Sequence, residues 1–132
     1  MRLIELGPQF VRYGMEPAPA HHGRRMADGV IEWGGFLVET RKPVESLEEA
    51  QGVWFLCPKC YLANGGVVGT HACEVTFEGK GVSPEHGCQG SDGKPTRWAV
   101  SGSGFEDLTV TPSIQLIGGC NWHGYITKGE VT

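Results

Sequence analysis

The stretch VWFLCPKC, residues 53–60, joins an apolar run directly to a Cys-x2-Cys pair. Val53 to Leu56 are β-branched, aromatic and aliphatic residues, the types that favour a buried strand. Cys57 and Cys60 follow at the spacing with which a zinc knuckle begins, because a tight turn aims both sulfurs at one point. The stretch therefore predicts a buried strand that ends in half of a metal site.

A second pair with the same spacing lies in GGCNWHG, residues 118–124. Together the two pairs supply three Cys and one His, a closed tetrahedral set for structural Zn²⁺. The predicted ligands are Cys57, Cys60, Cys120 and His123. The pairs lie farther apart than the about 15–20 residues of a zinc ribbon, so the metal is expected to tie the first core strand to the last. The alternative is a pair of buried or redox-active thiols, with His123 a hydrogen-bonded core residue.

Two His-x-Cys pairs, at residues 71–73 and 86–88, lie between these motifs. On an extended strand, residues i and i+2 share a face, so each pair can chelate a metal ion and both together can form a second site. The predicted ligands of that second site are His71, Cys73, His86 and Cys88. The alternatives are a disulfide between the two cysteines, or free thiols beside histidines that hydrogen-bond a turn.

Composition favours a β-rich domain that turns often. Glycine supplies 21 of the 132 residues, well above the usual level of about 7%, and the length fits one domain over residues 1–132. Short apolar runs between turns predict an all-β or β-rich fold of short antiparallel strands, tied by the zinc site. One short helix is expected at residues 46–51, where Ser46 and Glu49 match a capping box. Residues 16–29, rich in Pro, Ala, Gly and charge, predict a flexible exposed loop.

Hydropathy and charge disfavour several classes of protein. The longest apolar run, Val53 to Cys57, is far shorter than the roughly 20 residues of a membrane span. The first residues contain no apolar segment before a cleavage site, so we expect no secretory signal and a reducing, cytosolic compartment. The formal net charge of −4 disfavours general binding of nucleic acid.

No sequence motif assigns a catalytic residue. The chain lacks H-E-x-x-H, G-x-S-x-G and a P-loop, and its Cys and His spacing differs from that of nucleobase deaminases. A thioredoxin-like role needs a helix after the first cysteine, and residues 61–69 are expected to be too rich in glycine to form it. A metalloenzyme would need a carboxylate base, for which Asp107 is the best candidate, ahead of Glu74 and Glu106.

Several blocks of the sequence resemble a family of small phage and prophage proteins. They are LEEAQGVWFLCPKCYLANGGVVGTH at residues 47–71, RWAVSG at 97–102, EDLT at 106–109, PSI at 112–114, GCNWHG at 119–124 and GE at 129–130. The resemblance covers residues 46–131. The family is a domain of unknown function, and some of its members carry the unsupported label "ammonia monooxygenase".

This resemblance implies a zinc-binding β-domain of viral origin with no established reaction. Its pattern includes the four predicted ligands of the first site, together with His71. Four further positions match as framework residues, namely Trp98, Asp107, Pro112 and Ser113. Cys73 and Cys88 lie outside the family pattern, which weakens the prediction of a second site.

Three hypotheses for function follow. The first is a phage-encoded, zinc-stabilised accessory protein of the host cytoplasm or the virion, which binds a host factor or a virion component. It follows from a closed ligand set and from an acidic charge that suits protein partners. The second is a zinc-dependent hydrolase or other metalloenzyme with an open coordination position. The third is a nucleic-acid-binding zinc-knuckle protein, which the net charge disfavours.

Overall fold

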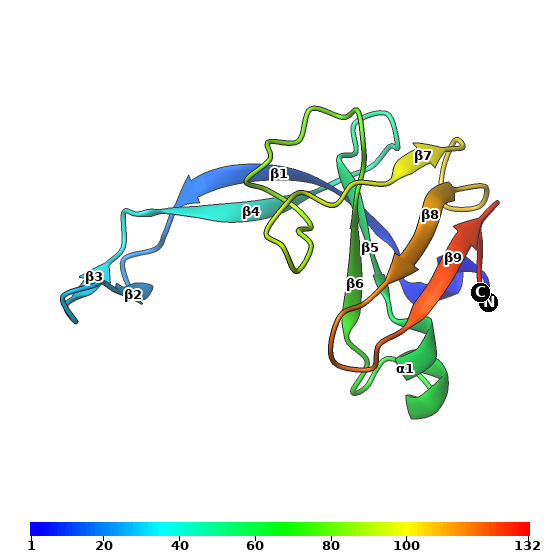
Figure 1. Cartoon of the computed structure of the whole chain (residues 1–132), viewed down its shortest axis with the longest axis horizontal. Coiled ribbons are helices and arrows are strands. Elements are labelled where there is room, and N and C mark those ends of the chain that lie inside the picture. Colours follow the sequence, from blue (N-terminus) through cyan, green and yellow to red (C-terminus); the bar gives the residue numbers. More distant parts are fainter.

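The computed structural model describes all of residues 1–132 and is rich in β-strands (Figure 1). In chain order, its elements are η1 (Leu3–Leu6, a 3-10 helix), β1 (Gln9–Pro17), β2 (Gly23–Arg25), β3 (Ile31–Trp33), β4 (Leu37–Val44), β5 (Gly52–Leu56), α1 (Pro58–Asn64), β6 (Ala72–Thr76), β7 (Ala99–Ser101), β8 (Thr109–Gln115), β9 (His123–Thr127) and β10 (Glu130–Val131). The predicted β-rich domain with one short α-helix is confirmed.

Two four-stranded antiparallel sheets share one hydrophobic core. The first has the strand order β4-β1-β5-β6 and the second the order β10-β9-β8-β7. A single cluster of buried side chains includes Val75 from the first sheet and Ile114 and Ile126 from the second. The ring of Phe55 on β5 meets the ring of Trp122 edge-on, with 6.0 Å between centroids. This packing holds β8 and β9 against β5 and β6, the strands whose ends carry the candidate site.

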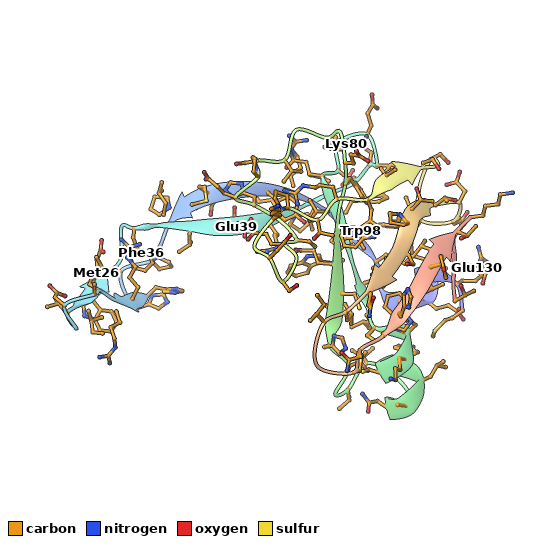
Figure 2. The ribbon with its side chains drawn as sticks, viewed as in Figure 1. Met26, Phe36, Glu39, Lys80, Trp98 and Glu130 are labelled. Atoms are coloured by element: carbon orange, nitrogen blue, oxygen red, sulfur yellow. The ribbon has the colours of Figure 1, made fainter.

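Strands β1 and β4 continue beyond the body of the protein as a long two-stranded arm (Figure 1). They pair from Phe10 opposite Val44 to Pro17 opposite Leu37. The hairpin β2–β3 lies at the far end of this arm, and Figure 2 shows the side chains that it carries. Because β1 also pairs with β5, the arm is continuous with the first sheet.

Residues 16–29, predicted as a flexible exposed loop, contain paired structure. All of them are exposed apart from Ala18, but they include the end of β1 and all of β2. Arg24 of β2 lies opposite Glu32 of β3 and forms a salt bridge with it, at 2.8 Å between nitrogen and oxygen. A cross-strand ion pair of this kind favours a hairpin over an irregular loop.

The α-helix α1 begins immediately after the first cysteine of the Cys-x2-Cys pair. The prediction that the glycines of residues 61–69 prevent a helix here is wrong. Pro58 occupies its start and Gly65 ends it, with a left-handed φ of 69°. The glycines of residues 61–69 are thus concentrated where the helix stops, so they do not interrupt it. No helix in the protein is long and apolar enough to cross a membrane.

Residues 46–51 form a turn and not the predicted helix. The Ser46 hydroxyl still accepts a hydrogen bond from the Glu49 backbone N–H, at 3.3 Å. The chain then enters β5 at Gly52, which leaves no room for a second helical turn. The capping interaction was therefore predicted correctly, but the element it caps was not.

Candidate metal centre and serine–histidine pair

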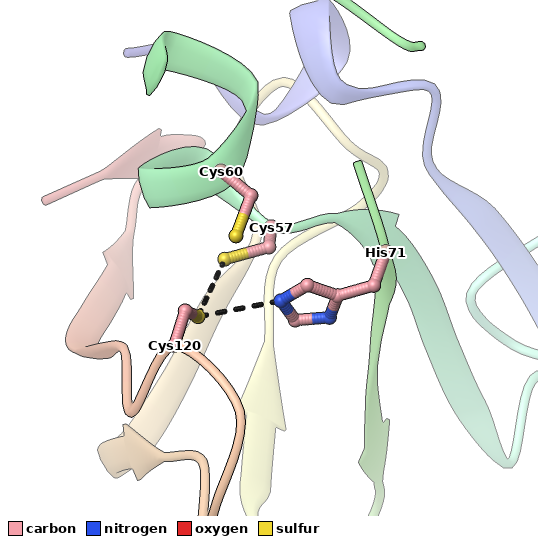
Figure 3. A group of neighbouring side chains, drawn as sticks. All are labelled: Cys57, Cys60, His71 and Cys120. Carbon is pink, nitrogen blue, oxygen red and sulfur yellow. Dashed lines mark hydrogen bonds between the residues drawn. The ribbon is translucent and has the colours of Figure 1, made fainter. Parts of the chain in front are cut away.

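Four side chains converge at one end of the two sheets (Figure 3). Their ligand atoms all lie within 4.8 Å of one another. We call this group the Cys3His cluster, and it consists of Cys57, Cys60, His71 and Cys120. Cys57 is fully buried, whereas His71 is exposed. Three thiol groups and one imidazole form a donor set that suits a tetrahedral metal ion.

Each member of the Cys3His cluster comes from a different place in the fold. Cys57 directly follows β5 and is the N-cap of α1, and Cys60 lies within that helix. His71 directly precedes β6, and Cys120 lies in the loop between β8 and β9. The cluster therefore connects both sheets and the helix.

Hydrogen bonds within the cluster already favour a thiolate at Cys120. Its Sγ lies 3.3 Å from Nε2 of His71 and 3.6 Å from Sγ of Cys57. The hydrogen bond with His71 is the largest cause that lowers the pKa of Cys120 to about 6. The same contact raises the pKa of His71. Because a thiolate is the form that binds metal, Cys120 is prepared for that role.

His123, predicted as the fourth ligand, lies outside the cluster, and His71 takes its place. The pairing of Leu56 with Ala72 sets the register of β5 and β6, and Cys57 N–H donates to the His71 carbonyl at 2.9 Å. This register brings His71 beside Cys57. Sequence spacing did not identify His71 as a ligand of the first site, because its position depends on strand pairing, although it belongs to the family pattern.

The structure does not bring the predicted second site together. His71 belongs to the Cys3His cluster, and Cys73 is buried in the core opposite Phe55. The Cys88 Sγ instead lies 3.3 Å from the carbonyl oxygen of Glu74, at the neighbouring position of β6. All five cysteines are free, so Cys73 and Cys88 form no disulfide.

His86, the remaining member of that predicted site, lies on a turn. Its backbone N–H donates to the Ser83 carbonyl at 3.0 Å, and its own carbonyl accepts a hydrogen bond from Arg97 at 2.8 Å. The two His-x-Cys pairs do not share a strand geometry, because the second pair contains Gly87, with a left-handed φ of 74°. The i, i+2 rule for extended chains therefore does not apply there.

The histidine left out of the cluster meets a serine instead. His123 begins β9, and its Nε2 lies 3.0 Å from Oγ of Ser113 on β8. The neighbouring residues Ile114 and Gly124 are buried, so Ser113 and His123 share the outward face of the sheet. We call them the Ser–His pair. From the sequence, Ser113 is expected only as a framework residue, because a serine ten residues before a histidine matches no catalytic spacing motif.

Two aromatic side chains flank the Ser–His pair. The indole Nε1 of Trp98 donates a hydrogen bond to the Ser113 carbonyl at 3.1 Å. The ring of Tyr125 stacks on that of His123, with 6.3 Å between centroids. These contacts fix the backbone of the serine and the plane of the imidazole.

Two of the three carboxylates considered as bases, Asp107 and Glu74, are bonded elsewhere. Asp107 accepts hydrogen bonds from the backbone N–H groups of Ser103 and Gly104 at 2.9 Å, and these bonds hold its pKa below the usual value. Glu74 accepts a hydrogen bond from the Trp54 indole at 2.6 Å and pairs with Arg41. Asp107 therefore stabilises a turn, and Glu74 belongs to an ion pair.

Comparison with known families gives one match. A model of the family described as "Bacterial ubiquitination-like system serine protease (BubE)" matches residues 36–132. No curated protein and no solved structure matches the chain. The matched residues include all of the Cys3His cluster and the Ser–His pair.

This match corrects the first hypothesis for function. The prediction of a phage-encoded accessory protein that acts by binding is wrong, because the matched family is described as a bacterial enzyme. The phage and prophage origin implied by the resemblance is not shown either. Hydrolysis, the chemistry of the second hypothesis, agrees better with the match, although the family description names a serine and not a metal as its basis.

Proposed function

The chain belongs to the BubE family, and from this premise we propose that it is a serine hydrolase, with Ser113 as nucleophile and His123 as general base. One observation carries the proposal, namely the 3.0 Å contact between Oγ of Ser113 and Nε2 of His123. A serine hydroxyl is a weak nucleophile until an adjacent base accepts its proton. This distance lies within the range at which a histidine performs that role.

The position of the Ser–His pair also suits catalysis. His123 is exposed and Ser113 is half-buried, so a substrate can reach both from solvent. Both side chains lie on strands of one sheet: His123 pairs with Gln115, and Ser113 follows an irregular stretch of β8 and directly precedes Ile114, which pairs with Gly124. A rigid support of this kind keeps a nucleophile and its base in register.

The reaction follows from these two side chains. Oγ of Ser113 attacks the carbonyl carbon of a peptide bond while Nε2 of His123 accepts the hydroxyl proton. The C–N bond then breaks, and the imidazolium gives that proton to the leaving amine. Water, deprotonated by the same imidazole, attacks the acyl-serine ester. The bond from the acyl carbon to Oγ breaks, the imidazolium returns its proton to Oγ, and the carboxylic acid leaves.

The Ser–His pair works as a dyad in this proposal. No carboxylate is hydrogen-bonded to His123, and the ring is held instead by stacking on Tyr125. Trp98 holds the serine from the opposite side through its hydrogen bond to the carbonyl. Nucleophile–base constellations recur with varied third members, and in this proposal the Tyr125 ring takes the place of the orienting carboxylate.

We further propose that the Cys3His cluster binds structural Zn²⁺. Sulfur-rich tetrahedral sets with one imidazole select Zn²⁺. Four protein ligands leave no open position for water, so the ion stabilises the fold and the chemistry stays with the Ser–His pair. Bound there, the ion cross-links β5 and α1 to the loop that joins β8 and β9.

A fluorophosphonate probe tests the proposed nucleophile, because it forms a covalent bond with activated serines. We expect the wild-type protein to be labelled once, at Ser113, as located by mass spectrometry of its peptides. Ser113→Ala abolishes labelling, and His123→Ala lowers its rate by at least about 100-fold, the size of a general-base effect. The matched control is Ser91→Ala, since Ser91 is also a serine but is exposed and lies in a different loop.

Failure to label the wild-type protein would contradict the proposal. So would labelling that persists in Ser113→Ala, or that is lost equally in the Ser91→Ala control. Thermal melting of each variant distinguishes loss of the nucleophile from loss of the fold.

A further inference from the structure

A groove of about 270 Å³ lies between the end of β8 and residues 88–98, with Glu74 of β6 also lining it. Residues 114–117 form its β8 side. Glu74 of β6, together with Cys88 and Trp98, lines the opposite side; Trp98 is labelled in Figure 2. Neither Ser113 nor His123 lines the groove, but its β8 side begins at Ile114, the residue that directly follows Ser113.

Strand β8, which lines one side of this groove, has a free edge. β7 pairs only with residues 109–111 of β8, so nothing pairs with the remainder of that edge. On the other edge, Leu116 N–H donates to the Trp122 carbonyl at 2.8 Å. Hydrogen-bonded and non-hydrogen-bonded positions alternate along an antiparallel ladder, so the backbone N–H and C=O of Gln115 point away from β9. Gln115 lines the groove, and these two groups are therefore directed toward it.

Trp98 marks where the free edge begins. The Ser113 carbonyl points away from β9, toward this edge, and accepts a hydrogen bond from Nε1 of Trp98 at 3.1 Å. Gln115 is the next residue whose backbone groups point the same way. A free strand edge of this kind pairs readily with an extended peptide.

The side chains around the groove favour an aliphatic occupant. Leu116, Ile117 and the Trp98 ring supply its apolar surface, and Ile117 is 76% exposed. The only acidic group, Glu74, already forms a salt bridge with Arg41. A basic side chain would find no unpaired carboxylate there, whereas an aliphatic one would remove apolar surface from water.

We propose that this groove binds the substrate as an extended peptide segment, paired with the free edge of β8 at Gln115 and with an aliphatic side chain against Leu116 and Ile117. The inference rests on the proposed serine hydrolase function, because the bound segment passes Ser113. Gln115 is two residues from Ser113, about 7 Å along the strand. The aliphatic residue therefore lies within about two residues of the bond that Ser113 attacks.

Two substrates measured side by side test this proposal. Quenched fluorescent decapeptides, with one position at a time randomised, report cleavage of extended segments. The small ester p-nitrophenyl acetate reports the Ser–His pair without needing the groove. In Gln115→Pro, which removes the backbone donor, we expect the ratio of kcat/KM for decapeptides to kcat/KM for the ester to fall roughly fivefold to tenfold.

A second variant addresses the side-chain part of the proposal. Ile117→Arg removes apolar surface from the groove, so the preference for an aliphatic residue near the cleaved bond should weaken in the randomised decapeptides. Val68→Arg is the matched control, since Val68 is 90% exposed and lies in the turn after α1. It should leave both the rate and the preference as in the wild type.

The outcomes separate the groove from the proposed function. If the wild type does not hydrolyse the ester, or if Ser113→Ala still does, the proposed serine hydrolase function is contradicted. Ester hydrolysis without cleavage of any decapeptide overturns the extended peptide as substrate. Gln115→Pro could also destabilise the fold, and a second measurement then uses the wild-type protein. A decapeptide that the protein cleaves is N-methylated at alternate residues, which removes the backbone donors needed for strand pairing. Unchanged kcat/KM for every methylated peptide overturns the pairing.

Discussion

The Cys3His cluster includes a residue of the loop that joins β8 and β9, whereas the Ser–His pair lies on the two strands themselves, and the two groups are built in different ways. The cluster gathers residues from β5, α1, the start of β6 and the β8–β9 loop, and its Cys57 is fully buried. The Ser–His pair uses only β8 and β9 and faces outward. A cross-link between distant segments stabilises a small domain, whereas two side chains on adjacent strands can react with a substrate. The comparison teaches that stability and chemistry are separated here, so substitutions should affect one property at a time.

The largest effect is expected from losing the metal. Cys57→Ser, or a chelator added to the wild type, should lower the free energy of unfolding by several kcal/mol, because metal binding contributes directly to folding. Metal analysis should find about one zinc per chain in the wild type and much less in the variant. Calorimetry of both proteins measures the change in stability.

Cys88→Ser is the matched control for this experiment, since Cys88 is a free cysteine outside the cluster. It should retain the metal and melt close to the wild-type temperature. Equal zinc content and equal melting in Cys57→Ser and wild type would show that the cluster does not bind metal.

Ser113→Ala should have the opposite effect: it should abolish activity and leave the stability and the metal content almost unchanged. Ester hydrolysis should fall by about 1000-fold or more, as when the nucleophile of a serine hydrolase is removed. The free energy of unfolding should change by no more than about 1 kcal/mol, because only one half-buried hydroxyl is lost. Zinc content should stay at one per chain. A variant that loses its metal along with its activity would mean that the two regions are not independent.

Replacing each of the two histidines by alanine tests which of them binds the metal. His71→Ala should weaken zinc binding at least about tenfold, since it removes a ligand, while His123→Ala should leave zinc affinity unchanged. Competition with a chromophoric chelator gives both affinities. The original prediction from sequence spacing reverses these two results, so the measurement decides directly between His71 and His123.

The smallest effect is expected from Trp98→Phe. This substitution keeps an aromatic ring but removes the donor to the Ser113 carbonyl, a hydrogen bond worth about 1 kcal/mol. We expect kcat for the ester to fall roughly fivefold, with zinc content unchanged. Because Trp98 acts through the serine backbone, the KM for the ester should change little. A fall in melting temperature with no change in kcat would assign Trp98 to the core alone.

Local patterns in the sequence predicted the β-rich fold and the three cysteines of the cluster. Cysteine spacing is informative because a knuckle is a local turn. The roles of His71 and Ser113 were not predicted because both depend on strand register, which no short spacing motif encodes. His71 reaches the cluster through the pairing of β5 with β6, and Ser113 meets His123 only once β8 pairs with β9.

Function could be predicted less well than fold for the same reason. The sequence contained no motif of a known hydrolase, so a binding role was expected from the absence of catalytic residues. His123 was assigned to the metal because of its two-residue separation from Cys120. Once strand pairing gives His71 to the cluster, His123 becomes free to act on Ser113.

The arm also has a consequence for how the protein can be prepared. The family match begins at residue 36, which invites expression of a shortened chain. However, β1 is an interior strand of the first sheet, and its Phe10 stacks on Phe105 with 4.2 Å between ring centroids. A chain trimmed to residues 36–132 would lose that strand and leave the edge of β5 open to self-association. The shortest workable piece of this protein therefore starts well before the recognisable family region.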